Sequence, residues 1–129
     1  ALRDRLKPGR NATLQIITVQ DRRWEVYRRG VDFIQKYIFP GGMLPAPKVL
    51  RAEVERAGLA VRHSVEFGPD YAATLKRWHE TFHDRWDDIR ALGFDERFRR
   101  MWDFYLCSCA ATFSSGNCDV TQITVTRPA

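Results

Sequence analysis

Hydrophobic positions along this chain follow two different periods. TLQIITV at 13–19 is a near-continuous apolar run after a Lys-Pro-Gly turn, which is typical of a strand buried on both faces. VTQITVT at 120–126 is rich in β-branched residues and predicts another strand. Between them, 59–67 alternates strictly and predicts a strand with one apolar face, formed by Leu59, Val61, His63, Val65 and Phe67.

Helical spacing occupies the segments between these strands. Apolar residues recur every three or four positions from 22 to 39, after Asp21 as a plausible N-cap and before the PGG turn at 40–42. A shorter helix is predicted at 47–57, because Pro47 suits a first helical position and Gly58 suits a helix stop. Two long helices with apolar stripes follow, and Gly93 separates them. Strands that alternate with helices predict an α/β fold.

Length and charge narrow the class of protein. A chain of 129 residues fits one domain with its own core. The net charge of +5 favours anionic partners such as nucleic acid or a phospholipid surface. No nucleic-acid motif accompanies the charge, and the apolar runs fall far short of a membrane span. The basic, aromatic segment at 22–39 suits either a helix lying on a membrane or an ordinary helix with solvated charges.

The cysteines indicate a reduced, cytoplasmic protein, because three is an odd number without paired spacing. Cys107 and Cys109 are two apart in a predicted helix and therefore point about 200° apart. They cannot chelate one ion together, and we expect both to be buried as small hydrophobic residues.

HETFH at 79–83 matches the H-E-x-x-H pattern of zinc hydrolases. His79 and His83 share a helical face, and the glutamate beside them could act as a general base for a metal-bound water. A catalytic zinc needs a third protein ligand, yet the remaining histidine, His63, lies on a strand face expected to be part of the core. The sequence does not indicate which Asp or Glu would supply a carboxylate as the third ligand. We therefore interpret the match as accidental and expect no metal.

The glycines and the first residues indicate part of a longer protein. The eight glycines are scattered, so no glycine-rich loop joins a strand to a helix and none can cradle a nucleotide. ALRDRLKPG at 1–9 is typical of the end of a helix already under way. We therefore interpret the chain as a fragment.

Four segments occur in one order: KYIFPGGMLP at 36–45, DYAATLKRWHETF at 70–82, RMWDFYLCSCAATF at 100–113 and DVTQITVTRP at 119–128. Together they resemble the carboxyl-terminal half of the cyclopropane-fatty-acyl-phospholipid synthases. These belong with the mycolic acid cyclopropane synthases among the S-adenosylmethionine-dependent methyltransferases. The resemblance implies the last three strands of a class I, Rossmann-like methyltransferase sheet, with the final strand antiparallel between the two before it, plus four helices. It also implies that 1–129 is the substrate-side portion and that the cofactor-binding half lies outside this chain.

The resemblance implies a reaction as well. The cis double bond of a phospholipid acyl chain takes a methyl group from S-adenosylmethionine, and a bound bicarbonate removes a proton from the resulting carbocation. The product is a cyclopropane or a methyl-branched chain. Both small molecules are expected in the full-length parent and neither in this chain, which is expected to be inactive alone. The implied location is cytoplasmic, peripheral to the anionic inner face of a membrane.

Site residues follow from the same resemblance. Tyr71 matches a tyrosine whose hydroxyl contacts the bicarbonate, and Val19 falls where a backbone group helps. Ile17 stands where better-known members have a bicarbonate-binding histidine, a departure from the pattern because its side chain cannot hydrogen-bond an anion. Positions lining the acyl channel, for which core packing is the alternative role, are matched by Tyr105, Cys109, Phe113 and, on the preceding helix, Trp78.

Two alternatives to this enzyme stay open, one from a different class of protein and one from within the enzyme class. One is a non-catalytic module that binds acyl chains or a protein partner, and the other is a small-molecule amine methyltransferase of the same superfamily. The resemblance also leaves the 13–19 strand with an exposed apolar edge. An unpaired edge favours association with a second copy, so we expect a homodimer.

Overall fold

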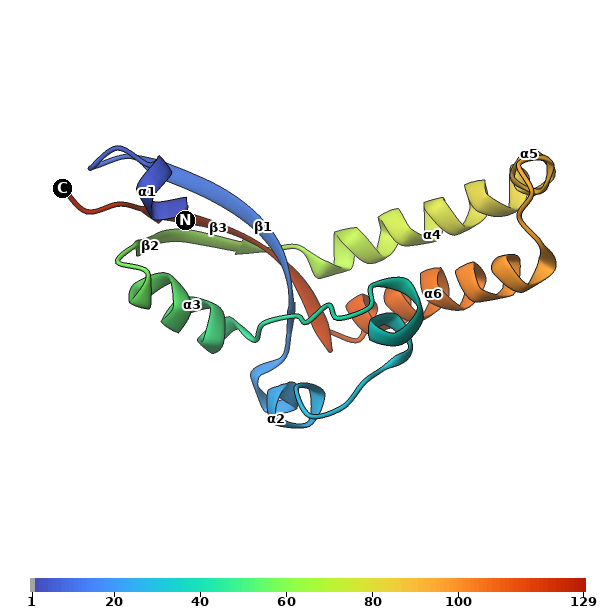
Figure 1. Ribbon diagram of the computed structural model, residues 1–129, viewed down its shortest axis with the longest axis horizontal. Coiled ribbons are helices and arrows are strands. Elements are labelled where there is room, and N and C mark those ends of the chain that lie inside the picture. The colour runs from blue at the N-terminus through green and yellow to red at the C-terminus, as the bar shows by residue number, and fades with distance from the viewer. Residues whose placement is uncertain (1) are drawn as a thin grey trace.

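A three-stranded sheet forms one end of the molecule (Figure 1). The structure is a computed structural model that describes residues 2–129. Its strands are β1 (Asn11–Val19), β2 (Ala60–Glu66) and β3 (Cys118–Thr126), in the order β1-β3-β2. β3 is antiparallel to both neighbours. The α/β class and the central, antiparallel position of the last strand are therefore confirmed.

Two long helices, α4 (Gly68–Asp84) and α6 (Glu96–Ser114), lie side by side and extend away from the sheet (Figure 1). A short helix, α5 (Trp86–Ala91), lies at their far end. Gly93 has φ of 99°, which a glycine adopts without strain, and it separates the helices as predicted. The first predicted long helix is itself divided after Asp84 into α4 and α5, which the apolar stripe did not predict. α6 begins at an N-cap, since the Asp95 carboxylate accepts a hydrogen bond from the backbone N–H of Phe98 at 2.9 Å.

α3 (Pro47–Arg56) covers one face of the sheet, and the short α1 (Leu2–Arg5) lies at the end of the sheet away from the long helices (Figure 1). Pro47 is its first residue, as predicted, and Ala46 gives it no side-chain cap. Asp21 supplies the cap from a distant segment, because its Oδ1 accepts a hydrogen bond from the Lys48 N–H at 3.1 Å. The Asp21 side chain therefore caps α3 and does not cap the segment that follows Asp21 itself.

The continuous helix predicted at 22–39 is wrong. The chain forms a 3₁₀ turn η1 (Asp21–Arg23), one turn of α2 (Trp24–Tyr27) and a short π-helix η2 (Ile34–Ile38). Gly30 weakens the helix between them, and Asp32 and Gln35 start a new one by exchanging side-chain-to-backbone hydrogen bonds of 2.8 and 3.0 Å. Helical spacing alone could not reveal that a second helix starts at Asp32 and Gln35. The segment curls over one end of the sheet instead of forming a rod (Figure 1).

The strand patterns also needed correction. A bulge between Val61 and His63 in β2 reverses which side chains face the core, so His63 is exposed instead of part of the core. β1 is not buried on both faces, because Thr13 and Gln15 lie on a face that no helix covers at that end. There they pair with β3 through Thr13–Thr124 and Gln15–Gln122 hydrogen bonds of 2.9 and 3.0 Å.

Two hydrophobic clusters form the core on opposite faces of β3. One joins β3 to α3 and contains Val54, Leu59, Ile123 and Val125. The other joins β3 to the long helices and contains Ala72, Leu75, Phe82, Trp86, Leu106, Ala110, Phe113 and Val120. Within residues 2–129, no helix is both long and apolar enough to cross a bilayer.

Candidate functional site

A cavity of about 530 Å³ lies where the end of β1, the curled segment at 22–39 with the turn that follows it, α4 and α6 meet. Most of its lining is apolar or aromatic. It brings together six of the seven residues that the resemblance implied for the site, from three elements far apart in sequence: Ile17, Val19, Tyr71, Tyr105, Cys109 and Phe113.

Tyr71 lies on the first turns of α4 with its ring packed between two aromatic neighbours. The ring centroid is 5.2 Å from that of Phe113 and 6.0 Å from that of Trp78, both in edge-to-face geometry. Among residues 2–129, no protein group hydrogen-bonds to the Tyr71 hydroxyl. The ring is held by packing, so the hydroxyl can serve a ligand.

Ile17 and Val19 alternate along β1 and face the same side of the sheet. Ile17 pairs with Val120 in register, and it presents only hydrocarbon to the cavity. The backbone N–H of Val19 donates to the Pro45 carbonyl at 3.1 Å, so that N–H is already engaged. Neither of the β1 side chains that line the cavity can therefore take the place of the histidine found in better-known family members.

The family-matched side chains on α6 are spaced four residues apart and therefore share one helical face: Tyr105, Cys109 and Phe113. Burial raises the pKa of the Tyr105 hydroxyl, and it raises the pKa of the Cys109 thiol to about 11. Cys109 is therefore a neutral, apolar lining group at neutral pH. Trp78 does not line the cavity; it is half exposed and reaches the site only through its contact with Tyr71.

Cys107 is exposed, which corrects the expectation that it is buried. It faces away from the cavity because its helical position is about 200° from that of Cys109. Its Sγ lies 3.5 Å from His79 Nε2, next to a side-chain cluster on the outer side of the long helices. The sequence pattern identified the separation of the two cysteines but not the neighbour of Cys107.

Polar cavity residues on the curled segment were missed by the sequence analysis. Tyr27 accepts a hydrogen bond from the Leu44 N–H at 3.1 Å, and Asp32 lines the cavity beside Gln35. Burial is the main cause that raises the pKa of Tyr27 and of Cys109, and the negative charge of Asp32 is a smaller cause in the same direction. The Asp-x-x-Gln spacing was the available signal, since it is typical of a reciprocal helix start.

The family model described as mycolic acid cyclopropane synthetase matches residues 1–123. The chain belongs to this family. A relative at 41% identity over 98% of the chain is the tuberculostearic acid methyltransferase of Mycobacterium tuberculosis. Another, at 36% identity over 74% of the chain, is the cyclopropane-fatty-acyl-phospholipid synthase of Escherichia coli. The chain spans 30% and 24% of the lengths of these two relatives.

Solved structures of the mycolic acid cyclopropane synthetase family share this fold. A mycolic acid cyclopropane synthase complexed with SAH and CTAB superposes with a TM-score of 0.82 at 28% identity. The match covers 94% of this chain and 45% of that one. The likeness confirms the methyltransferase fold for the sheet and the helices around the cavity.

Neither strand-to-helix junction that follows β1 or β2 within residues 2–129 is a glycine-rich loop of the kind that holds a nucleotide. β1 leads into Gln20 and η1 without a glycine, and β2 leads into α4 through a single glycine, Gly68. The Gly68 N–H is taken by the Asp119 carboxylate at 2.7 Å. A Cβ at position 68 would lie 2.7 Å from that carboxylate, so this glycine serves packing instead of a ligand.

Proposed function

We propose that this chain is the substrate-side portion of a methyltransferase that acts on the cis double bond of a phospholipid acyl chain. The observation that carries the proposal is the apolar cavity and the six family-matched residues that line it. Pockets of roughly 300–1,000 Å³ suit small molecules or lengths of acyl chain. The names of the relatives and the SAH in a related structure support S-adenosylmethionine as the methyl donor.

The lining suits a reaction that passes through a carbocation. Aromatic faces stabilise a nearby cation through their negative quadrupole, and Tyr71, Tyr105 and Phe113 supply three. Asp32 adds a carboxylate whose charge already acts on the cavity-lining Cys109. An apolar lining excludes water that would otherwise capture the cation. The donor would supply an electrophilic methyl group; the residues of this chain hold the acceptor.

We assign Tyr71 the role of holding the base that removes the proton. Loss of a proton from the methylated acyl chain needs an acceptor, which we propose to be bicarbonate held by the Tyr71 hydroxyl. Ile17 cannot take the role of the family histidine. Loss of the proton from the added methyl group closes a cyclopropane ring, whereas loss from a neighbouring chain carbon leaves a methyl-branched alkene, so these two products compete.

We place the cofactor-binding half in the longer protein that contains this chain, and the chain alone is expected to be inactive. The curled segment supports a peripheral position on an anionic, cytoplasmic membrane face. It exposes Val26, Val31, Phe39 and Met43 beside a group of arginines, Arg22, Arg23, Arg28 and Arg29. Homodimerisation through the edge of β1 is part of the same proposal.

Product analysis of the full-length protein tests the proposal. The purified enzyme is incubated with S-adenosylmethionine and a cis-monounsaturated phospholipid, and the masses of the acyl chains are measured by mass spectrometry. A gain of one CH₂ per chain, from a methyl added and a proton lost, is expected. Proton NMR of the product then separates a ring from a branch.

Other outcomes favour the competing functions. A methylated amine with untouched lipid would show an amine methyltransferase. Lipid binding without any methylated product would show a non-catalytic module. Either result would overturn the assignment of the double bond as the acceptor.

A further inference from the structure

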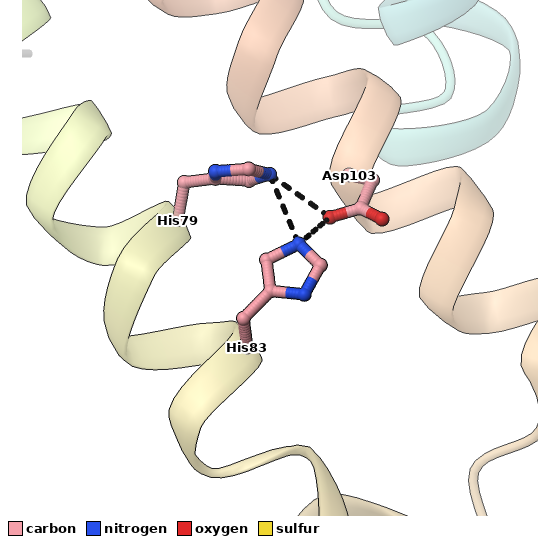
Figure 2. Close-up of side chains that lie close together, drawn as sticks. All are labelled: His79, His83 and Asp103. Atoms are coloured by element: carbon pink, nitrogen blue, oxygen red, sulfur yellow. Dashed lines mark hydrogen bonds and ion pairs between the residues drawn. The ribbon is translucent and has the colours of Figure 1, made fainter.

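The HETFH segment lies outside the cavity, and the structure gives it partners that the sequence did not identify. His79 and His83 are one turn apart on α4, with their Nε2 atoms 3.2 Å from each other. α6 brings Asp103 to the same point, so that its Oδ1 lies 3.0 Å from His79 Nε2 and 2.7 Å from His83 Nε2 (Figure 2). Cys107, one turn further along α6, places Sγ 3.5 Å from His79 Nε2.

Hydrogen bonding cannot account for all three contacts among His79, His83 and Asp103. The carboxylate only accepts, so each imidazole that bonds to it must carry a proton on Nε2. Two protonated Nε2 atoms cannot then bond to each other, although they lie 3.2 Å apart. At most two of the three contacts are satisfied in any protonation state with an ionised Asp103. A cation at their centre would use the lone pairs of all three atoms at once.

The donor set and spacing identify the class of cation. Two imidazole nitrogens, a carboxylate oxygen and a nearby thiol suit a borderline transition metal such as Zn²⁺. Bonds of about 2.0–2.2 Å in a tetrahedral site place neighbouring ligand atoms about 3.3–3.6 Å apart. The three ligand atoms here lie 2.7–3.2 Å apart, so outward shifts of a few tenths of an ångström would admit the ion.

Accessibility and position also fit a metal. The three side chains are 31%, 36% and 32% exposed, which lets an ion enter from solvent. None of the three lines the cavity, so a bound ion would not take part in acyl-chain chemistry. It would instead join α4 to α6, the two helices that carry Tyr71 and Tyr105.

We propose that His79, His83 and Asp103 form a Zn²⁺ site, and that Cys107, which contacts only His79 of these three, turns in to become the fourth ligand. The bound ion clamps α4 against α6. Arg99 competes with the ion for His83, because its Nη2 lies 3.4 Å from His83 Nδ1 and can only donate a hydrogen bond to it. Metal binding through Nε2 puts the proton on Nδ1, so Arg99 must turn away when the ion enters.

Zinc titration of the 129-residue chain, freed of metal by a chelator, tests the site. One Zn²⁺ per chain is expected by calorimetry, together with a higher melting temperature. Zinc should also slow alkylation of the exposed Cys107. Co²⁺ in place of zinc should show the visible bands of tetrahedral coordination, with a thiolate charge-transfer band that Cys107→Ser removes.

Matched variants make the test specific. His83→Gln and Asp103→Asn, each checked for folding by circular dichroism, should weaken binding at least about tenfold. His63→Gln removes an exposed histidine on β2 and should leave binding unchanged. Absence of saturable binding to the folded chain would overturn the proposal. So would binding that survives both cluster substitutions, which would place the ion elsewhere.

Discussion

Replacing Tyr71 by phenylalanine separates a chemical role of its hydroxyl from a structural one. The ring keeps its contacts with Phe113 at 5.2 Å and Trp78 at 6.0 Å. Since no described protein group bonds to the hydroxyl, the free energy of unfolding should change by less than about 0.5 kcal/mol. The substitution therefore removes one ligand contact and little else.

The expected kinetic cost follows from the charge of the proposed base. A hydrogen bond to a charged group contributes about 1.5–3 kcal/mol. At about 1.4 kcal/mol per factor of ten, kcat of the full-length enzyme should fall roughly 10- to 150-fold. The KM for S-adenosylmethionine should stay unchanged, because the hydroxyl acts in the chemical step.

The assay follows methylated acyl chains by mass spectrometry under saturating substrate. Tyr37→Phe is the matched control: this tyrosine is half exposed, does not line the cavity, and should keep full activity. Unchanged turnover in Tyr71→Phe would refute the role of the hydroxyl. A large loss of stability in that variant would refute the premise that the hydroxyl has no structural partner.

Three further predictions concern pH, the metal site and assembly. Burial raises the pKa of the Cys109 thiol from 9.0 to about 11, so the stability linked to this thiol is present below pH 9 and is lost as the pH rises through about 11. Urea unfolding should therefore show that the unsubstituted chain loses stability over this pH range and that Cys109→Ala loses less. Equal losses in the two proteins would contradict the assignment. Arg99→Gln should tighten zinc binding in calorimetry, because the glutamine oxygen can accept a hydrogen bond from His83 Nδ1–H and arginine cannot. Weaker binding would contradict the competition between Arg99 and the ion. Sedimentation of the 129-residue chain should show a concentration-dependent dimer formed through the edge of β1, and a monomer at every concentration would remove that edge as an interface.

The sequence was sufficient where regular period and burial coincide. The apolar stripe of the second long helix predicted α6, which the structure confirms. The β-branched run at 120–126 predicted β3 as a strand, whereas its central position came from the family resemblance. The periodic segment at 22–39 failed because hydrophobic spacing does not record the competing helix start at Asp32 and Gln35. In β2, one bulged residue was enough to reverse the faces of an alternating pattern.

The two candidate sites differ in how far the sequence could identify them. The positions that line the cavity came from the family resemblance, and the fold brought six of them together. Asp32 was missed because it enters the cavity from an irregular segment. Asp103 could not be paired with HETFH in advance, because their meeting depends on how α4 and α6 pack, which no local pattern specifies.

Photocrosslinking tests most directly whether the cavity is the acyl-chain site. A phospholipid with a photoactivatable group in place of the double bond is bound to the full-length enzyme, irradiated and mapped by fragment-ion mass spectrometry. Adducts are expected on cavity residues such as Tyr71, Tyr105 and Cys109, and excess cis-monounsaturated phospholipid should suppress them. Adducts confined to other surfaces, or cavity adducts that the unsaturated lipid does not suppress, would contradict the assignment.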